Sequence, residues 1–84
     1  MVGFGAFPNP AREELNINLA EYVNKAVDIA IYNTFGKVIT TKHIDNVSNA
    51  VEKFDVNDFS TGQYLIRVTS IGKRAATQQV MVQK

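Results

Sequence analysis

Apolar and polar side chains alternate along most of the chain, which is the repeat of a β-strand with one buried face. Leu15, Ile17 and Leu19 share one face of the clearest example, and the same alternation returns at 27–31 and 64–68. The pattern predicts seven short strands, near residues 3–7, 13–20, 25–32, 37–44, 50–56, 63–70 and 75–83. Short strands that recur about every 8–12 residues are typical of an antiparallel sandwich. We therefore predict an all-β fold in which about seven antiparallel strands form two packed sheets.

Turn-forming residues separate the predicted strands. Pro8-Asn9-Pro10 interrupts any strand, because proline lacks a backbone N–H donor and restrains the residue before it. Gly36 closes a hairpin-length loop that begins at Asn33, and we expect it to adopt a positive φ. The segment from Pro10 to Leu15 could instead open a helix with Asn9 as its N-cap. Because strand-like alternation starts at Leu15, we expect at most one helical turn there.

Length, charge and composition limit the functions that the chain can have. Its 84 residues suit one small domain, and we assign residues 1–84 to a single module. The net charge of +1 and the scattered basic residues give no reason to expect a nucleic-acid partner. The absence of cysteine excludes disulfides, zinc–thiolate sites and a thiol nucleophile.

The sequence does not predict membrane insertion or self-directed export. No apolar run approaches the roughly 20 residues of a membrane helix. The first seven residues lack the basic and long apolar regions of a signal peptide. We therefore expect that any export takes place as part of a longer precursor, with Met1 as a start codon added to an excised fragment.

No group of residues predicts catalysis, a metal site or a cofactor. His43 is the only histidine, and we interpret it as a half-exposed strand residue with Asp45 as an incidental neighbour. Asp55, Asn57 and Asp58 lack the spacing of an EF-hand loop. Asn57 and Asp58 are more simply explained as turn formers that bond their own backbone. We therefore predict a non-enzymatic module without a cofactor.

The aromatic residues are spread over the chain, and we expect most of them in the core. Tyr22 and Tyr32 are the expected exposed exceptions, and the phenylalanines, Phe35 among them, belong to the expected core. Tyr64 should also be buried, with its hydroxyl bonded to a partner near the sheet edge. Because there is no tryptophan, a carbohydrate-stacking platform is poorly supported.

Three internal stretches and the last strand occur in an order and at a spacing that are known from a protein family. Phe7–Ala11 followed by Glu14–Ile17 is similar to a YPNPA…LNI opening, and Val27–Val38 is similar to a V-x-I-Y-N-x-x-G-x-V hairpin. Phe54–Val68 is similar to a D-V-S-x-L-x-x-G-x-Y-x-x-R-V motif, and Gln79–Lys84 to a short apolar strand that ends in lysine. Together they resemble the C-terminal sorting domain (type A) of proteins exported by the type IX secretion system.

The resemblance implies an immunoglobulin-like β-sandwich at the C-terminus of a larger exported protein of the Bacteroidota type. The precursor would enter the periplasm by its own N-terminal signal, where the outer-membrane translocation machinery would recognise this domain. A sortase-like peptidase commonly removes such domains and joins the cargo to a surface lipopolysaccharide. The implied destination is therefore the cell surface or the medium. Phe59 and Gln63 depart from the family pattern, which usually has a leucine and an aliphatic residue at these positions.

The resemblance also implies recognition roles for residues in the matching motifs. The Pro8–Pro10 turn would stiffen the connection to the cargo, with any cleavage upstream of it. Arg67 lies on the strand face opposite Tyr64, so we expect an exposed guanidinium that is either solvated or bound to a carboxylate of a receptor. The last strand could be read by addition of a partner strand while it pairs within the sandwich. The recognition residues expected in this way are Pro8, Asn9, Pro10, Gly62, Tyr64, Arg67, Val80, Val82 and Lys84.

Other classes of function stay open at this stage. The strongest alternative is an immunoglobulin- or fibronectin-like spacer, or a module that binds carbohydrate or mediates adhesion. Exposed aromatic side chains lined along one face would favour that alternative. A chaperone-like or protease-inhibitor domain is a weaker one. An exposed edge strand would also permit a weak homodimer.

Overall fold

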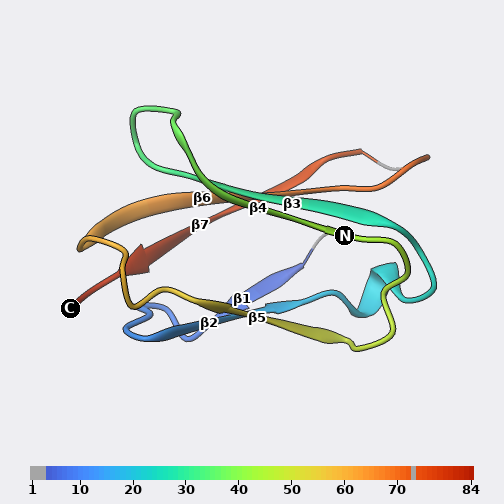
Figure 1. The fold of residues 1–84 in the computed structure, drawn as a ribbon, viewed down its shortest axis with the longest axis horizontal. Helices are drawn as coiled ribbons and strands as arrows, with labels where there is room; N and C mark the ends of the chain where they lie inside the picture. The colour runs from blue at the N-terminus through green and yellow to red at the C-terminus, as the bar shows by residue number, and fades with distance from the viewer. Residues whose placement is uncertain (1–3, 73) are drawn as a thin grey trace.

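A computed structural model describes residues 4–72 and 74–84 of the chain as two antiparallel sheets that pack face to face (Figure 1). The three-stranded sheet has the order β1-β2-β5 and consists of β1 (Gly5–Phe7), β2 (Glu14–Asn18) and β5 (Val51–Asp55). The four-stranded sheet has the order β4-β3-β6-β7 and consists of β3 (Val27–Tyr32), β4 (Val38–Ile44), β6 (Gly62–Thr69) and β7 (Ala76–Val82). Each predicted strand overlaps an observed one, which confirms the seven-stranded sandwich.

The chain order of the strands gives the immunoglobulin-like arrangement. β2 and β5 pair in one sheet, while β3, β6 and β7 form the adjacent strands of the other. β4 follows β3 and pairs with it, rather than joining β5 as the fourth strand does in constant-type immunoglobulin domains. Because β4 pairs with β3, the two sheets have three and four strands. Two expectations lie outside the described residues: the start of the first strand at Gly3 and the added start codon at Met1.

The core consists of the inward faces of both sheets. Leu15 and Ile17 of β2 meet Ile29 and Ile31 of β3 across the sandwich, as their alternation predicts. Ile66 of β6 belongs to the same cluster. Burial of these side chains provides the main driving force for folding in a domain of this size. Among the described residues, no polar or charged residue is buried.

The only helical element among the described residues is a short 3₁₀ turn, η1 (Ala20–Tyr22), rather than a turn after Pro10. The side-chain oxygen of Asn18 accepts a hydrogen bond from the Ala20 N–H at 2.9 Å and starts this turn. Ala11 instead forms a bridge with Val82 of β7. No helix in the described part of the chain is long or apolar enough to cross a membrane.

Several predictions about aromatic residues were wrong. Tyr22 is fully buried, because η1 turns its side chain into the space between the sheets beside Leu19. Burial, with the nearby charge of Glu21 adding to it, raises the pKa of Tyr22. Phe35 is 92% exposed, because it lies at the tip of the β3–β4 hairpin, beyond the sheet. Phe7, which was also expected in the core, is exposed at the end of β1, and Tyr32 is half-buried rather than exposed.

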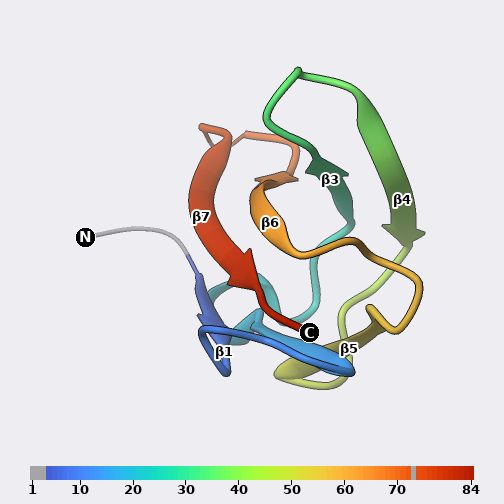
Figure 2. The ribbon, with the colours of Figure 1, turned by 90° about the vertical axis from the view of Figure 1, so that its left-hand side faces the viewer.

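The two long sides of the sandwich are closed differently. Figure 2 shows β1 beneath β7 on one side and β5 beneath β4 on the other. On the β4–β5 side, Lys42 of β4 forms an ion pair with Glu52 of β5. The Lys42 ammonium also lies 5.5 Å from the centre of the Phe54 ring. A lysine at an inward position of an edge strand therefore connects the sheets and discourages pairing with another chain.

Candidate recognition site

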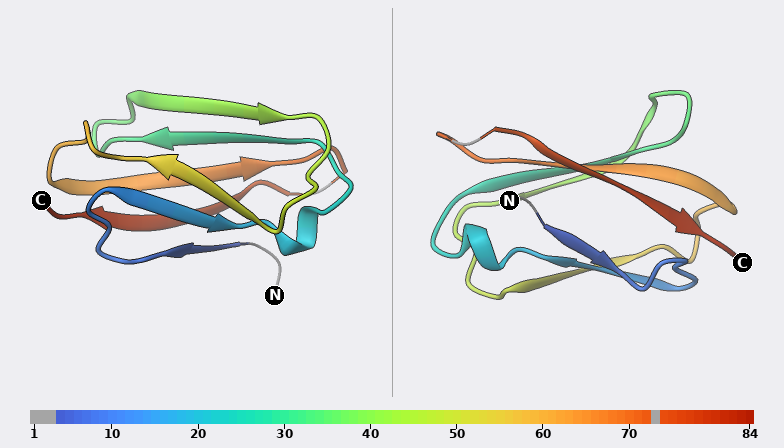
Figure 3. Two further views of the ribbon diagram at one scale, coloured as in Figure 1. Left: turned by 60° about the horizontal axis from the view of Figure 1, so that its bottom comes forward. Right: turned by 180° about the vertical axis from the view of Figure 1, so that it is seen from behind.

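Three segments that are distant in the sequence meet at one end of the sandwich, beside the last residue of the chain (Figure 3). They are the turn between β1 and β2 (Pro8–Arg12), the loop between β5 and β6 (Val56–Thr61), and the end of the chain from Val80 to Lys84. We call this assembly the junction end. Each segment belongs to one of the motifs that the sequence analysis singled out.

The Pro8–Arg12 turn lies along the outer edge of β7. The Met81 N–H donates to the side-chain oxygen of Asn9 at 3.0 Å, and the Met81 carbonyl accepts from the Ala11 N–H at 2.8 Å. The Gln83 N–H then donates to the Ala11 carbonyl at 2.8 Å. Asn9 thus supplies with its side chain an acceptor for the β7 backbone, next to two prolines that have no N–H to donate. The turn therefore covers the edge of β7 at Met81 and Gln83.

Lys84 connects all three segments through its side chain. Its ammonium donates hydrogen bonds to the carbonyl oxygens of Arg12, of Val56 at 2.7 Å and of Asn57 at 3.1 Å. An ammonium has three N–H donors, so these neutral acceptors use its full capacity. The backbone N–H of Lys84 also donates to the Thr61 hydroxyl at 3.0 Å. Bonds to a charged donor are stronger than bonds between neutral groups, so Lys84 anchors the end of the chain.

The Val56–Thr61 loop is shaped by its own short-range contacts. The Asn57 N–H donates to the Asp55 carboxylate at 2.9 Å, so Asp55 forms the turn that we had assigned to Asn57 and Asp58. The Tyr64 hydroxyl donates to the Ser60 carbonyl at 2.7 Å, which confirms the prediction of a buried ring with a bonded hydroxyl. The Phe59 ring packs on Tyr64 with the ring centres 5.1 Å apart. These contacts hold the loop that carries two of the carbonyls that Lys84 binds, those of Val56 and Asn57.

Eight of the nine expected recognition residues lie at or beside the junction end, and Arg67 does not. Val80 and Val82 are buried, and they pair in register with Tyr64 and Gly62 respectively. Gly36 has the expected positive φ, +82°, and the φ of Gly62 is +158°. The Gly62 value is close to extended backbone, so this glycine begins β6 rather than forming a tight turn. The recognition roles themselves stay predictions.

Arg67 lies in the middle of the outer face of the four-stranded sheet. It is exposed, as predicted, and its cross-strand neighbours are Ala30 and Thr77. It lines a groove of about 520 Å³ that also contacts Tyr32 and Gln79. The sequence places Arg67 on this face, but the groove is formed by three strands and the β3–β4 hairpin together, so it could not be predicted from one strand alone.

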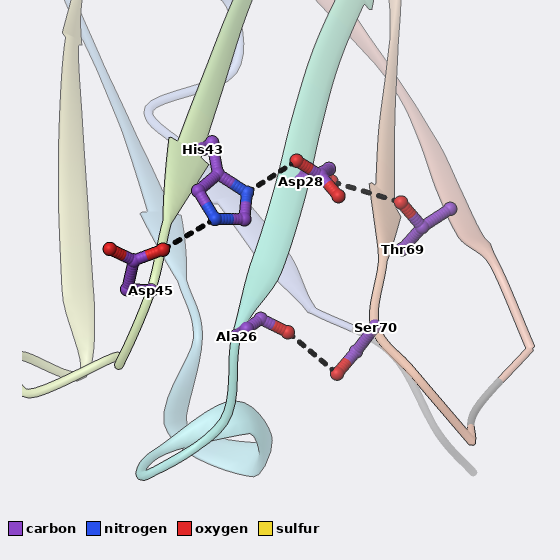
Figure 4. Close-up of polar contacts among 6 residues, drawn as sticks. All are labelled: Ala26, Asp28, His43, Asp45, Thr69 and Ser70. Atoms are coloured by element: carbon purple, nitrogen blue, oxygen red, sulfur yellow. Dashed lines mark hydrogen bonds and ion pairs between the residues drawn. The ribbon is translucent and has the colours of Figure 1, made fainter.

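His43 forms a second polar cluster on the outer face of β3 and β4 (Figure 4). Its Nδ1 lies 2.6 Å from an Asp28 oxygen, and its Nε2 lies 2.7 Å from an Asp45 oxygen. Because ionised carboxylates only accept hydrogen bonds, both contacts require a protonated ring. The hydrogen bonds to Asp28 and Asp45 raise the pKa of His43. The contact with Asp28 was missed, because it depends on the pairing of Asp28 opposite His43.

The geometry of this cluster does not match a metal site. Over the residues that the structure describes, no group of three histidine, cysteine or acidic side chains could hold a metal ion. The two carboxylates contact opposite ring nitrogens, and the His43 side chain is 55% exposed. Figure 4 also shows the end of β6 tied to β3, where the Ser70 hydroxyl donates to the Ala26 carbonyl at 2.8 Å. The cluster therefore joins neighbouring strands.

The fold and the junction end define a small immunoglobulin-like β-sandwich whose sequence motifs gather where its last residue is anchored. The chain belongs to the family described as secretion system C-terminal sorting domain, whose model matches residues 5–83. No curated protein matches the chain. Membership makes the chain a sorting signal of type IX secretion, a class not known to be catalytic. It implies contact with the secretion machinery, a fused N-terminal cargo, and export across the outer membrane to the cell surface or the medium.

Proposed function

We propose that the translocation machinery recognises this domain in the periplasm through the junction end, as a folded surface. The observation that carries the proposal is the binding of one lysine to three chain segments: Lys84 contacts the carbonyls of Arg12, Val56 and Asn57. Residues that are far apart in the sequence form one surface there only after folding. A receptor that binds this surface distinguishes a folded domain from an unfolded one.

The backbone hydrogen bonds of β7 determine where a partner strand could add. Asn9 and Ala11 already bind the outward-facing groups of Met81. Backbone groups alternate in direction along an antiparallel strand, so Thr77 and Gln79 also face away from β6. We expect any added strand to pair at Thr77 and Gln79, and the covered segment to be read through its side chains and Lys84.

We further propose that a sortase-like peptidase cleaves the exported protein on the N-terminal side of β1. β1 pairs with β2 in register from Gly5 opposite Asn18 to Phe7 opposite Asn16. Ala6 of this strand is also buried in the core. A peptidase requires an extended and accessible chain, which favours a site upstream of Gly5 over one between Gly5 and Pro8. Mass spectrometry of the C-terminus of the released or surface-attached cargo tests this position.

The decisive experiment fuses the domain to the C-terminus of a periplasm-directed fluorescent protein. The fusion is expressed in a Bacteroidota strain with intact type IX secretion and in one that lacks the translocon. We expect fluorescence at the surface or in the medium of the intact strain only. Periplasmic retention of a folded domain in both strains would contradict a self-sufficient signal and would favour a spacer or binding module.

A pair of lysine substitutions tests the junction end itself. Lys84→Met removes the three hydrogen bonds to backbone carbonyls. Lys53→Met removes the same charge from an exposed position on β5, away from the junction end. We expect only Lys84→Met to reduce export, with both variants folded by circular dichroism. Equal export of the two variants would contradict recognition through the junction end.

A further inference from the structure

The outer face of the four-stranded sheet carries a groove of about 520 Å³ that lies apart from Lys84 and its partners. Its lining side chains come from β3, β6, β7 and the β3–β4 hairpin, and they include Tyr32, Asn33, Gln63, Leu65, Arg67 and Gln79. Its volume lies within the range of about 300–1,000 Å³ that is usual for small-molecule sites. The charge and the hydrogen-bonding groups of its lining indicate the kind of ligand that it would bind.

The charge of the groove favours an anion. Arg67 is the only charged residue among those that line it, and the lining contains no carboxylate. The cross-strand neighbours of Arg67 are Ala30 and Thr77, which are small and uncharged. Within the described part of the chain, Arg67 has no ion pair. A guanidinium with a free planar fork matches a carboxylate, which it can bind through two parallel hydrogen bonds.

The uncharged groups of the groove match a ligand that is rich in hydroxyl groups. Gln63, Gln79 and Thr77 supply amide and hydroxyl groups, which both donate and accept hydrogen bonds. The Asn33 carboxamide oxygen accepts from the N–H groups of Phe35 at 2.9 Å and of Lys37 at 3.0 Å. These bonds fix the hairpin that forms one wall of the groove. The half-buried ring of Tyr32 adds an aromatic surface for the apolar face of a ring.

The position of the groove on a sheet face favours a saccharide over an extended peptide. Peptides commonly bind a sheet at its edge, where unpaired backbone groups are available. Here the floor belongs to β3, β6 and β7, whose backbones pair with one another in register. The floor therefore offers side chains rather than backbone groups. We propose that this groove binds an acidic saccharide, with the carboxylate of a uronic acid unit on Arg67.

The test is a titration of the isotope-labelled 84-residue domain, followed by NMR of the backbone amides. The probes are a galacturonic acid tetramer, a neutral galactose tetramer and tetraglutamate. We expect the acidic tetramer to shift the signals of Tyr32, Arg67 and Gln79. The neutral tetramer and tetraglutamate should bind at least about tenfold more weakly. The neutral tetramer lacks the carboxylate that Arg67 would bind, and tetraglutamate lacks the hydroxyl-rich rings that the uncharged side chains would bind.

Three substitutions sharpen the titration. Arg67→Gln should weaken binding of the acidic tetramer about tenfold or more, since it removes the charge-assisted pair of hydrogen bonds. Thr77→Glu should have the same effect by placing a carboxylate directly opposite Arg67. Arg74→Gln removes the same charge outside the groove and should leave binding unchanged. Retained signal dispersion shows that each variant is folded.

Several results would overturn the proposal. Equal binding of tetraglutamate would indicate a site for an acidic peptide, such as a receptor segment. Equal binding of the neutral tetramer would show that the charge of Arg67 does not contribute to binding. Equal loss of binding in Arg74→Gln would reveal attraction by net charge alone. Absence of any shift at about 10 mM probe, a concentration that detects even millimolar affinity, would exclude the site.

Discussion

The side-chain nitrogen of Lys84 lies 2.7 Å from the carbonyl oxygen of Val56, a residue 28 positions earlier in the chain. Val56 in turn donates its N–H to the carbonyl of Glu13 at 2.9 Å and is fully buried. The last residue of the sequence is therefore coupled through a buried valine to the start of β2. This coupling explains how a short terminal segment can report on the folding of the whole sandwich.

Replacement of Lys84 by methionine should lower the free energy of unfolding by about 1–2 kcal/mol. The loss comes from hydrogen bonds between a charged donor and three carbonyls, reduced by the solvent that replaces them at an exposed position. Urea denaturation of Lys84→Met against Lys53→Met measures the difference. Equal midpoints for the two variants would show that the lysine contacts contribute nothing to stability.

Asn9 is expected to act through its side-chain oxygen alone. Asn9→Ala removes the acceptor for the Met81 N–H, so it should destabilise the domain by about 1 kcal/mol and speed hydrogen exchange at Met81. Asn9→Asp keeps an oxygen at the same place and should restore protection. If Asn9→Asp behaves like Asn9→Ala, the proline turn rather than this hydrogen bond holds the edge of β7.

The strands of this fold are predictable because their signal is local. A buried face of Leu15 and Ile17, or of Ile29 and Ile31, requires alternation at every second position, and that requirement is visible in the sequence itself. This alternation predicts each end of the seven observed strands to within two residues. Residues outside the strands lack such a constraint. Tyr22 and Phe35 were both misplaced for this reason: η1 turns Tyr22 inward, and the hairpin carries Phe35 away from the sheet.

The candidate site could be predicted only in part. The motif resemblance identifies the residues of the junction end, including Asn9 and Lys84, but not the partners that each one binds. Those partners depend on strand register and on how loops from different sheets meet, which no single stretch of sequence encodes. The same limit applies to His43, whose contact with Asp28 follows from the pairing of β3 with β4.

Two phenylalanines should respond in opposite ways to truncation. Phe54 is buried between the sheets, so Phe54→Ala should destabilise the domain by about 3–5 kcal/mol, comparable with the whole stability of a small domain. Phe35 projects into solvent, so Phe35→Ser should change stability by less than about 0.5 kcal/mol. Thermal unfolding followed by circular dichroism measures both. A large effect of Phe35→Ser would mean that the hairpin tip packs on the domain in solution.

The His43 cluster should make stability depend on pH. Hydrogen bonds to Asp28 and Asp45 raise the pKa of His43 above the ordinary histidine value of 6.5, so the folded state binds the proton more tightly than the unfolded chain. The stabilisation is complete below the unfolded pKa and is lost as pH rises through the higher folded pKa. Because His43 is the only histidine, His43→Gln should abolish the pH dependence of the unfolding midpoint between the pKa values of His43 in the unfolded and the folded chain.

NMR titration of the His43 ring gives an independent measurement. Asp28→Asn should lower the pKa of His43 more than Asp45→Asn, because the hydrogen bond to Asp28 is the largest cause of the rise. Thr69 also contacts the Asp28 backbone, at 3.4 Å, and Thr69→Val should leave the titration unchanged. An unshifted pKa in the wild-type domain would contradict the paired contacts.

Removal of Gln79–Lys84 should retain the cargo in the periplasm, because it deletes the segment that completes the junction end. The deletion also removes Val80 and Val82 from the core, so an unfolded domain would give the same result for a different reason. Deletion of Lys84 alone separates the two explanations, since both valines and the cover formed by Asn9 and Ala11 are kept. We expect this shorter deletion to leave a folded domain that is exported poorly. Normal export of the six-residue deletion would show that the signal does not lie in the last strand. The Pro8–Arg12 turn and the Val56–Thr61 loop would then be the remaining candidates.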